Sequence, residues 1–305
     1  MNVLAIDGGA STAKWCVQNQ EGKTLMYQTT GPLSGHIFNS ESRKQSETIL
    51  RNICNTAHKI APISKVVAGI SGLDSKSDQA SWIRGVIEKS LNIKDILISD
   101  DLFFVFLGLS SPGEGLLVYA GTGCIAYHLT KDYNVIRANG YGYLIDDCGG
   151  GFWIGQQALK QWLRSMETHQ PTTSALDERL VKKFGSRDWN IVREKVYKGG
   201  RETVASVTKE VRFAAKVGDP NALKIFHEAG IEIGKLANRL FAMTELKETE
   251  MHLIGGVTNC HEFLDTGLRG NLDSNIQYSP IISNNAEIMA SIVKKYSFKQ
   301  LAHLS

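Results

Sequence analysis

One pattern occurs twice in this chain and most constrains its fold: an apolar strand, a glycine hairpin and a second strand. The first copy spans residues 3–17, with Gly8-Gly9 at the turn. The second copy spans residues 116–128, with Gly121-Thr122-Gly123 at the turn. Further strands and helices follow each copy, which is typical of an α/β domain. The sequence therefore predicts two similar halves facing each other across a cleft, with both hairpins at its floor.

The remaining elements are expected from apolar periodicity. Residues 41–60 have apolar side chains at Ile49, Ile53, Ala57 and Ile60, which lie on one face of a helix. Further helices are expected at 77–90, between about 152 and 247, and at 285–296. Strands are expected at 2–7, 12–18, 23–29, 65–70, 95–99, 115–120, 124–130, 134–138 and 251–254.

Composition excludes several classes of protein. A length of 305 residues suits two domains, and a hydrophobic content of 42% is enough for a packed core. The net charge of +3 gives no reason to expect nucleic acid or an anionic membrane as partner. The five cysteines lack Cys-x-x-Cys spacing, which indicates free thiols in a reducing cytoplasm. The most apolar stretches, 96–109 and 115–127, are too short or too broken to span a bilayer.

The first hairpin has the residue types that a magnesium nucleotide requires. Asp7 ends the first strand, where a carboxylate can hold a metal ion through water. Gly8 and Gly9 leave backbone N–H groups exposed at the turn. Ser11 and Thr12 add hydroxyl donors, and Lys14 adds a cation. A plain β-hairpin is the alternative, because a glycine turn alone only reverses the chain.

Two later glycine segments also follow strands. Gly121-Thr122-Gly123 offers a hydroxyl and backbone donors for a second phosphate cradle, although an ordinary hairpin turn has the same composition. Gly255-Gly256 follows the strand 251–254, and a backbone without side chains there could accept an aromatic base and its ribose. Taken alone, this second segment would be a simple junction between a strand and a helix.

Two carboxylate clusters complete the candidate site. Asp100 and Asp101 end the strand 95–99 and open an apolar helix, a position from which a carboxylate can accept a proton from a hydroxyl. The alternative is a helix N-cap, which aspartate also favours. Residues 146–151 form a glycine-rich loop with two aspartates, which could contact metal or substrate or could be an interdomain turn. No His-rich metal pattern, Walker-type phosphate loop or dinucleotide fingerprint occurs.

In this order the motifs resemble the acetate kinase, sugar kinase, Hsp70 and actin superfamily. Within it, the chain is most similar to the N-acetylglucosamine kinase branch, grouped with the BadF/BadG/BcrA/BcrD-type ATPases. The family's two phosphate motifs correspond to residues 7–15 and 120–123, and its adenosine motif to 254–256. Its sugar-side Gly-x-Ser-Gly segment corresponds to residues 69–74. Its Gly-x-Gly … Gly-Asp-Glu-Gly-Ser segment corresponds to residues 140–155.

The resemblance implies two ribonuclease H-like domains with a nucleotide cleft between them. Their expected bounds are 1–104, joined by the closing helix 285–305, and 105–284. The implied activity is an ATP-dependent kinase with Mg²⁺ that phosphorylates a hydroxyl of an amino sugar such as N-acetylglucosamine or glucosamine. Asp101 matches the family's catalytic base best, because Gly108 then falls at the family's glycine seven residues later; Asp100 is the second choice.

The resemblance also implies residues that contact the sugar, and here the chain departs from the family. Ser34, His36 and Asn39 lie where the family has a sugar-contacting asparagine, and Ser71, Gly72 and Asp147 lie in matching segments. Cys148 replaces the family's glutamate, and the bulky residues 102–104 follow the proposed base instead of small ones.

The expected partner is a small-molecule sugar, with a homodimer left open. Nucleic acid and membrane are not expected as partners. One alternative is an ATPase that activates a partner enzyme, like the activators of 2-hydroxyacyl-CoA dehydratases. Another is a nucleotide-binding protein without catalysis.

Overall fold

A computed structural model describes residues 1–10, 12–35, 39–167 and 174–302. The chain divides into two compact units, the first made of residues 1–112 and 283–305 and the second of residues 113–282. Each unit contains one five-stranded sheet with helices, so both are α/β. The boundary expected at 104/105 falls within helix α3 (Asp101–Leu109), which belongs wholly to the first unit.

The sheet of the first unit has the strand order β3-β2-β1-β4-β5. Strand β1 runs antiparallel to β2 and parallel to β4, so the sheet is mixed. All five strands occur where apolar periodicity predicts them, with ends shifted by at most two residues. Their bounds are β1 (Asn2–Gly8), β2 (Ala13–Gln18), β3 (Thr24–Thr30), β4 (Ile63–Ile70) and β5 (Ile96–Ser99).

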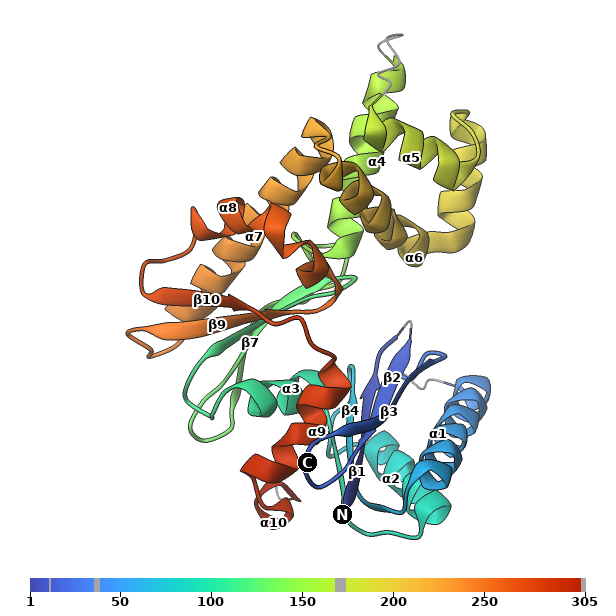
Figure 1. Cartoon of the computed structure of the whole chain (residues 1–305), viewed down its shortest axis with the longest axis vertical. Coiled ribbons are helices and arrows are strands. Elements are labelled where there is room, and N and C mark those ends of the chain that lie inside the picture. Colours follow the sequence, from blue (N-terminus) through green and yellow to red (C-terminus); the bar gives the residue numbers. More distant parts are fainter. Residues whose placement is uncertain (11, 36–38, 168–173, 303–305) are drawn as a thin grey trace. The chain divides into compact units, whose positions relative to one another are not determined.

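Helices cover both faces of this first sheet (Figure 1). Helices α1 and α2 lie on one face, where Leu50 and Ile53 of α1 pack in a core with Leu4 and Ile6 of β1. Helices α3 and α9 lie on the other face, so the last part of the chain returns to the first unit. The helices are α1 (Ser40–Ile60), α2 (Asp78–Leu91), α3, α9 (Asn285–Lys295) and α10 (Phe298–Ala302).

The sheet of the second unit repeats the same strand order, read as β8-β7-β6-β9-β10. Strand β6 is antiparallel to β7 and parallel to β9, as β1 is to β2 and β4. The predicted internal repetition is therefore confirmed at the level of topology. The bounds are β6 (Leu116–Ala120), β7 (Cys124–Leu129), β8 (Val135–Asn139), β9 (Thr249–Ile254) and β10 (Ile276–Pro280). Apolar periodicity missed β10, a short edge strand that ends at a proline.

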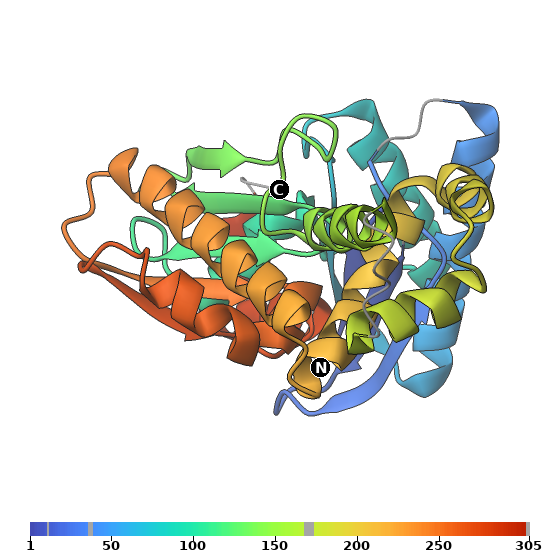
Figure 2. The same ribbon diagram turned by 90° about the horizontal axis from the view of Figure 1, so that it is seen from above.

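Long helices account for most of the rest of the second unit. Helix α7 lies along one face of the sheet (Figure 2), with Phe226 and Ile233 fully buried. Within the part of the chain that the structure describes, no helix is both long and apolar enough to cross a membrane. The bounds are α4 (Gly151–Glu167), α5 (Ala175–Phe184), α6 (Trp189–Lys216), α7 (Pro220–Ala242), the 3-10 helix η1 (Gly256–Cys260) and α8 (His261–Arg269).

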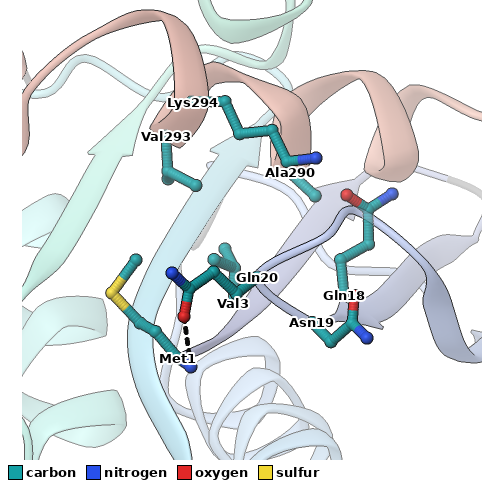
Figure 3. A pocket seen from close by; sticks show the side chains of 8 residues that line it. All are labelled: Met1, Val3, Gln18, Asn19, Gln20, Ala290, Val293 and Lys294. Carbon is teal, nitrogen blue, oxygen red and sulfur yellow. Dashed lines mark hydrogen bonds between the residues drawn. The ribbon is translucent and has the colours of Figure 1, made fainter.

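A small cavity of about 160 Å³ lies in the first unit between the start of β1, residues 18–20 and α9 (Figure 3). The Met1 amino group lies 3.5 Å from Oε1 of Gln20. Lys294 Nζ donates to the carbonyl of Glu21 over 2.7 Å. This cavity is at the N-terminal end of β1, whereas the glycine hairpin follows its C-terminal end, so the two are separate features.

Candidate functional site

Asp7 lies at the C-terminal end of β1, directly across from Lys14 on β2. Its side chain is only 7% exposed. Burial raises the pKa of Asp7 to about 6, while the charge of Lys14 and a hydrogen bond from the Asn285 side chain lower it. The ionised carboxylate is therefore poorly solvated, and a nearby cation would stabilise it.

Backbone hydrogen bonds join two separate segments to the first hairpin. The N–H of Ser71 donates to the carbonyl of Gly8 over 2.8 Å. The N–H of Leu33 donates to Gly9, and that of Gly35 to Ser71, each over 3.0 Å. The structure thus brings together the first phosphate motif, the predicted sugar-side segment and the loop that contains Ser34.

The two aspartates after β5 lie in different environments. Asp100 is the N-cap of α3, with Oδ1 accepting from the N–H of Leu102 at 3.0 Å and Oδ2 lying 3.4 Å from the N–H of Gly72. Asp101 is the first residue of the helix and is 8% exposed. Burial raises the pKa of Asp101 well above its usual range, and the charges of Asp100 and Asp7 raise it further. Asp101 is thus a carboxylate with increased basicity beside a second carboxylate.

Close backbone packing holds Asp101 in position. A Cβ on Gly69 of β4 would lie 2.8 Å from the Cα of Asp101 and 2.7 Å from Cε of Met289. A Cβ on Gly108 would lie 2.8 Å from the carbonyl oxygen of Ile288. Helix α3 therefore rests directly on β4 and α9, and glycine is the residue that fits at both contacts.

The second hairpin is attached to the start of α4. The N–H of Gly121 donates to the carbonyl of Gly123 over 2.9 Å and closes the turn. The N–H groups of Gly151 and Phe152 donate to the carbonyls of Gly121 and Thr122 over 2.8 and 2.9 Å. The first N–H groups of a helix have no partner within the helix, and here the hairpin supplies it.

The Gly255-Gly256 segment lies against the same hairpin. Gly255 has a φ of 102°, and a Cβ there would lie 2.5 Å from the carbonyl oxygen of Ala120. A Cβ on Gly256 would meet no atom within 4 Å, so this residue borders open space. A 3-10 helix follows, and α8 begins only at His261. The predicted helix after this segment is therefore delayed by one short 3-10 element.

Asp147 of the second unit combines burial with an uncommon backbone conformation. It is 4% exposed, and its φ of 88° is rare for any residue with a side chain. A Cβ on Gly123 would collide with its Oδ2 and would lie 3.4 Å from Nη2 of Arg201. Burial raises the pKa of Asp147, whereas the charge of Arg201 and backbone N–H groups of Gly142 and Cys124 lower it. Carboxylate, guanidinium and hairpin thus meet at one point.

Arg201 was not predicted as a site residue. It lies within the helical stretch 152–247, far from the hairpin in sequence. The only local signal is the Gly199-Gly200 pair before it, because two adjacent glycines are unfavourable inside a helix.

The other predicted residues lie in varied settings. Ser11 and His36 are outside the described residues. Thr12 is exposed, and its carbonyl accepts from the N–H of Gly9 at 3.1 Å. Asn39 is the N-cap of α1, where its Oδ1 accepts from the N–H of Ser42 at 2.8 Å.

The donor set suits magnesium better than a metal held by protein ligands alone. Among the residues described, no group of three or more His, Cys, Asp or Glu side chains could hold a metal ion. Mg²⁺ keeps several waters and takes one or two carboxylates plus substrate phosphates. The buried carboxylate of Asp7 beside the glycine turn fits that requirement.

Comparison with known proteins identifies the family. The model of the BadF/BadG/BcrA/BcrD ATPase family matches residues 4–293. The chain belongs to this family. An N-acetylmuramic acid/N-acetylglucosamine kinase of Clostridium acetobutylicum is 26% identical over 301 residues, which is 96% of this chain and 98% of that protein.

Solved structures with the same fold include other kinases. A candidate N-acetylglucosamine kinase from Porphyromonas gingivalis has a TM-score of 0.76 at 17% identity and covers 97% of this chain and 100% of that one. A ROK family glucokinase from Streptomyces griseus, in complex with glucose and AMPPNP, has a TM-score of 0.67 at 13% identity, covering 97% and 99%. Together with the repeated strand order, these likenesses confirm the predicted fold of two ribonuclease H-like α/β domains.

Proposed function

We propose that this protein is an ATP-dependent kinase that transfers the γ-phosphoryl group to a hydroxyl of an amino sugar such as N-acetylglucosamine or glucosamine. The observation that carries the proposal is Asp101, a buried carboxylate of raised pKa at the start of α3, beside Asp7. Family membership and the nearly full-length similarity to an N-acetylmuramic acid/N-acetylglucosamine kinase support the same reaction.

Asp101 accepts the proton of the sugar hydroxyl as that oxygen attacks phosphorus. A general base works best when its pKa lies near the working pH, and burial moves the pKa of Asp101 in that direction. Asp7 would hold Mg²⁺, an ion that keeps several of its waters in such sites. When bound, this ion neutralises charge on the β- and γ-phosphates.

The glycine segments bind the nucleotide in this proposal. In the first unit, Gly8, Gly9, Ser11, Thr12 and Lys14 contact phosphate oxygens. In the second unit, the hairpin Gly121-Thr122-Gly123 provides further N–H and hydroxyl donors, which stabilise charge on the transferring group. Gly255-Gly256 borders the base and ribose, and the open space at Gly256 supports this assignment.

The sugar is bound by Ser34, His36, Asn39, Ser71, Gly72 and Asp147. Two of the described segments are joined by the hydrogen bond from Gly35 to Ser71, which supports a shared role. Cys148 stands where the family's glutamate would be, so one polar contact to the sugar is replaced by a thiol. We therefore expect the acceptor preference to differ from that of relatives with glutamate.

The test measures ADP release by purified protein with MgATP and a panel of acceptors: N-acetylglucosamine, glucosamine, N-acetylmuramic acid and glucose. We expect at least one amino sugar to stimulate ADP release and to appear as a phosphorylated product in mass spectra. Asp101→Asn should lower this activity by about 10²–10⁴-fold while retaining ATP binding by calorimetry. Asp100→Asn is the matched control and should retain turnover.

Two outcomes would overturn the proposal. The first is an absence of phosphorylated sugar across the whole panel. The second is ADP release that no sugar stimulates, which would instead favour an ATPase that serves a partner enzyme.

A further inference from the structure

Helix α6 contains a break that brings Arg201 to the second hairpin. Gly200 has φ and ψ of 54° and −142°, which are not helical values, and it separates residues 189–199 from residues 201–216. The second part packs on α4, where a Cβ on Gly155 would collide with the carbonyl of Val204. Arg201 is thus the first residue of the segment that is pressed against α4. Helix α4 begins at the carbonyls of the second hairpin. The break therefore places the guanidinium of Arg201 close to that hairpin.

The guanidinium of Arg201 lies in a defined environment. Its Cζ is 5.3 Å from the centre of the Tyr143 ring, which itself packs at 4.7 Å on the ring of Phe152. Its Nη2 and the Oδ2 of Asp147 both lie within 3.4 Å of the Cβ position of Gly123. The aromatic face and the carboxylate together restrict the orientation of the guanidinium.

Asp147 needs a positive neighbour to remain ionised. The side chain is buried, and its Oδ1 has no hydrogen-bond partner among the residues that the structure describes. A buried carboxylate without compensation takes up a proton. Asp146 opposes ionisation of Asp147 through its own negative charge, whereas Arg201 favours it. Cys124 lies beside Asp147, but its thiol is fully buried with a raised pKa and stays neutral.

The charged groups of α7 act on the neighbours of Asp147. Arg239 favours the ionised forms of Asp146 and Cys148, and Glu232 opposes ionisation of Cys148. Arg201 is therefore the cation that acts on Asp147 itself.

We propose that Arg201 is a positioning residue for the sugar, because it keeps Asp147 ionised and oriented against the second hairpin. Asp147 is then ionised when the acceptor binds and can accept a hydrogen bond from a sugar hydroxyl. The inference rests on the proposed function, in which Asp147 contacts the acceptor. It extends that function by naming the residue that controls the state of this contact.

The kinetic test compares Arg201→Gln and Arg201→Lys with Arg193→Gln, an exposed arginine of α6 that precedes the break. We expect Arg201→Gln to raise the KM for the sugar about tenfold or more, the equivalent of one lost charged contact, and to leave the KM for ATP within about twofold. In Arg201→Gln the acidic limb of the pH profile of kcat/KM should shift to higher pH. The buried Asp147 then takes up a proton more readily, because the positive charge of Arg201 is gone. Arg201→Lys should keep the wild-type acid limb, and Arg193→Gln should change nothing.

A purely structural role predicts a different pattern. In that case Arg201→Gln lowers Tm, affects both KM values equally and leaves the pH profile in place. A double mutant adds a second check, since Arg201→Gln should cost little when Asp147→Asn is already present. Full additivity of the two changes would overturn the proposal.

Carbon-13 NMR of carboxyl-labelled aspartate tests the coupling without any turnover. The Asp147 signal is assigned by its loss in Asp147→Asn, and its pKa is measured in wild type and in Arg201→Gln. A higher pKa in the variant supports the proposal, and an equal pKa in the two proteins overturns it. If wild type phosphorylates no sugar, the proposed function fails, while this titration still decides what Arg201 does to Asp147.

Discussion

The two units share one strand order but carry their chemistry in different places. In the first unit the candidate carboxylates lie close to strand ends, with Asp7 at the end of β1 and Asp101 two residues after β5. The corresponding positions of the second unit are occupied by Tyr119 at the end of β6 and by Ile282, two residues after β10. A common topology therefore does not require a common distribution of charge.

The second unit obtains its charged groups from a long connection instead. One helix, α1, joins β3 to β4 in the first unit, whereas α4 to α7 lie between β8 and β9 in the second. Asp147 and Arg201 both come from that longer connection. The same strand order therefore presents its charged residues at strand ends in one unit and on a long connection in the other.

The largest effect is expected from the two adjacent aspartates at the start of α3 in the first unit. Asp101→Asn should lower kcat by about 10²–10⁴-fold, the usual contribution of a general base, with ADP affinity retained. Asp100→Asn keeps a side-chain oxygen for the α3 cap, because asparagine caps a helix as well as aspartate does, and should have only a small effect on stability and on kcat. Steady-state kinetics and calorimetry with ADP measure both. Equal losses of kcat in the two variants would show that the aspartates do not divide their roles.

The next effect concerns backbone geometry in the second unit. Gly255→Ala should lower the free energy of unfolding by about 2–3 kcal/mol, because it combines a positive φ with a collision on Ala120. Gly256→Ala is the matched control and should change this free energy by less than about 1 kcal/mol, the helical cost of glycine against alanine being of that size. Thermal and urea unfolding measure the difference. Similar stability of both variants would contradict the close packing at Gly255.

A smaller effect links charge to stability in the first unit. The folded pKa of Asp101 is raised, so the folded state binds its proton more tightly than the unfolded state does. Stability contributed by this group is therefore present at low pH and is lost as pH rises from about 3.9 through the folded pKa. Asp101→Asn removes this penalty and should raise Tm at pH 8 by about 2–4 °C for each kcal/mol regained.

The control for this effect is pH itself. Near pH 4 the wild-type carboxyl is protonated, and the two proteins should unfold at the same temperature. Asp147→Asn in the second unit should gain less than Asp101→Asn, because Arg201 already compensates the charge of Asp147. An equal gain at pH 4 and pH 8 would show that ionisation is not the cause.

The smallest effect concerns Asn39 and tests whether it contacts the sugar or only caps α1. Asn39→Ser keeps a side-chain oxygen for the α1 cap, so Tm should change by less than about 2 °C because serine and asparagine cap equally well. If Asn39 also contacts the sugar, the KM for the sugar should rise several-fold while the KM for ATP stays constant. An unchanged KM would assign Asn39 to the helix cap alone. Asn39→Ala loses the cap as well and serves as the comparison.

Much of the fold and part of the candidate site follow from local sequence. Apolar periodicity predicts nine of the ten strands found in the described part of the chain, because the burial of one or both strand faces imposes a pattern on the apolar residues. The glycine hairpins can also be predicted from the local sequence, because a tight turn requires small residues at fixed positions. Strand β10 was not predicted, because it has only five residues, is partly exposed and ends at Pro280.

What the sequence by itself determined is the repeated strand, hairpin and strand, and the order of the motifs along the chain. Only the tertiary structure decided that Asp100 caps α3 while Asp101 is buried, since both are aspartates at one helix start. The proximity of Arg201 to Asp147 depends on tertiary packing. It requires the break at Gly200 and the contact of α6 with α4, which bring together segments that are far apart in the sequence. Local propensity encodes elements, whereas burial and charge at a site depend on which elements pack together.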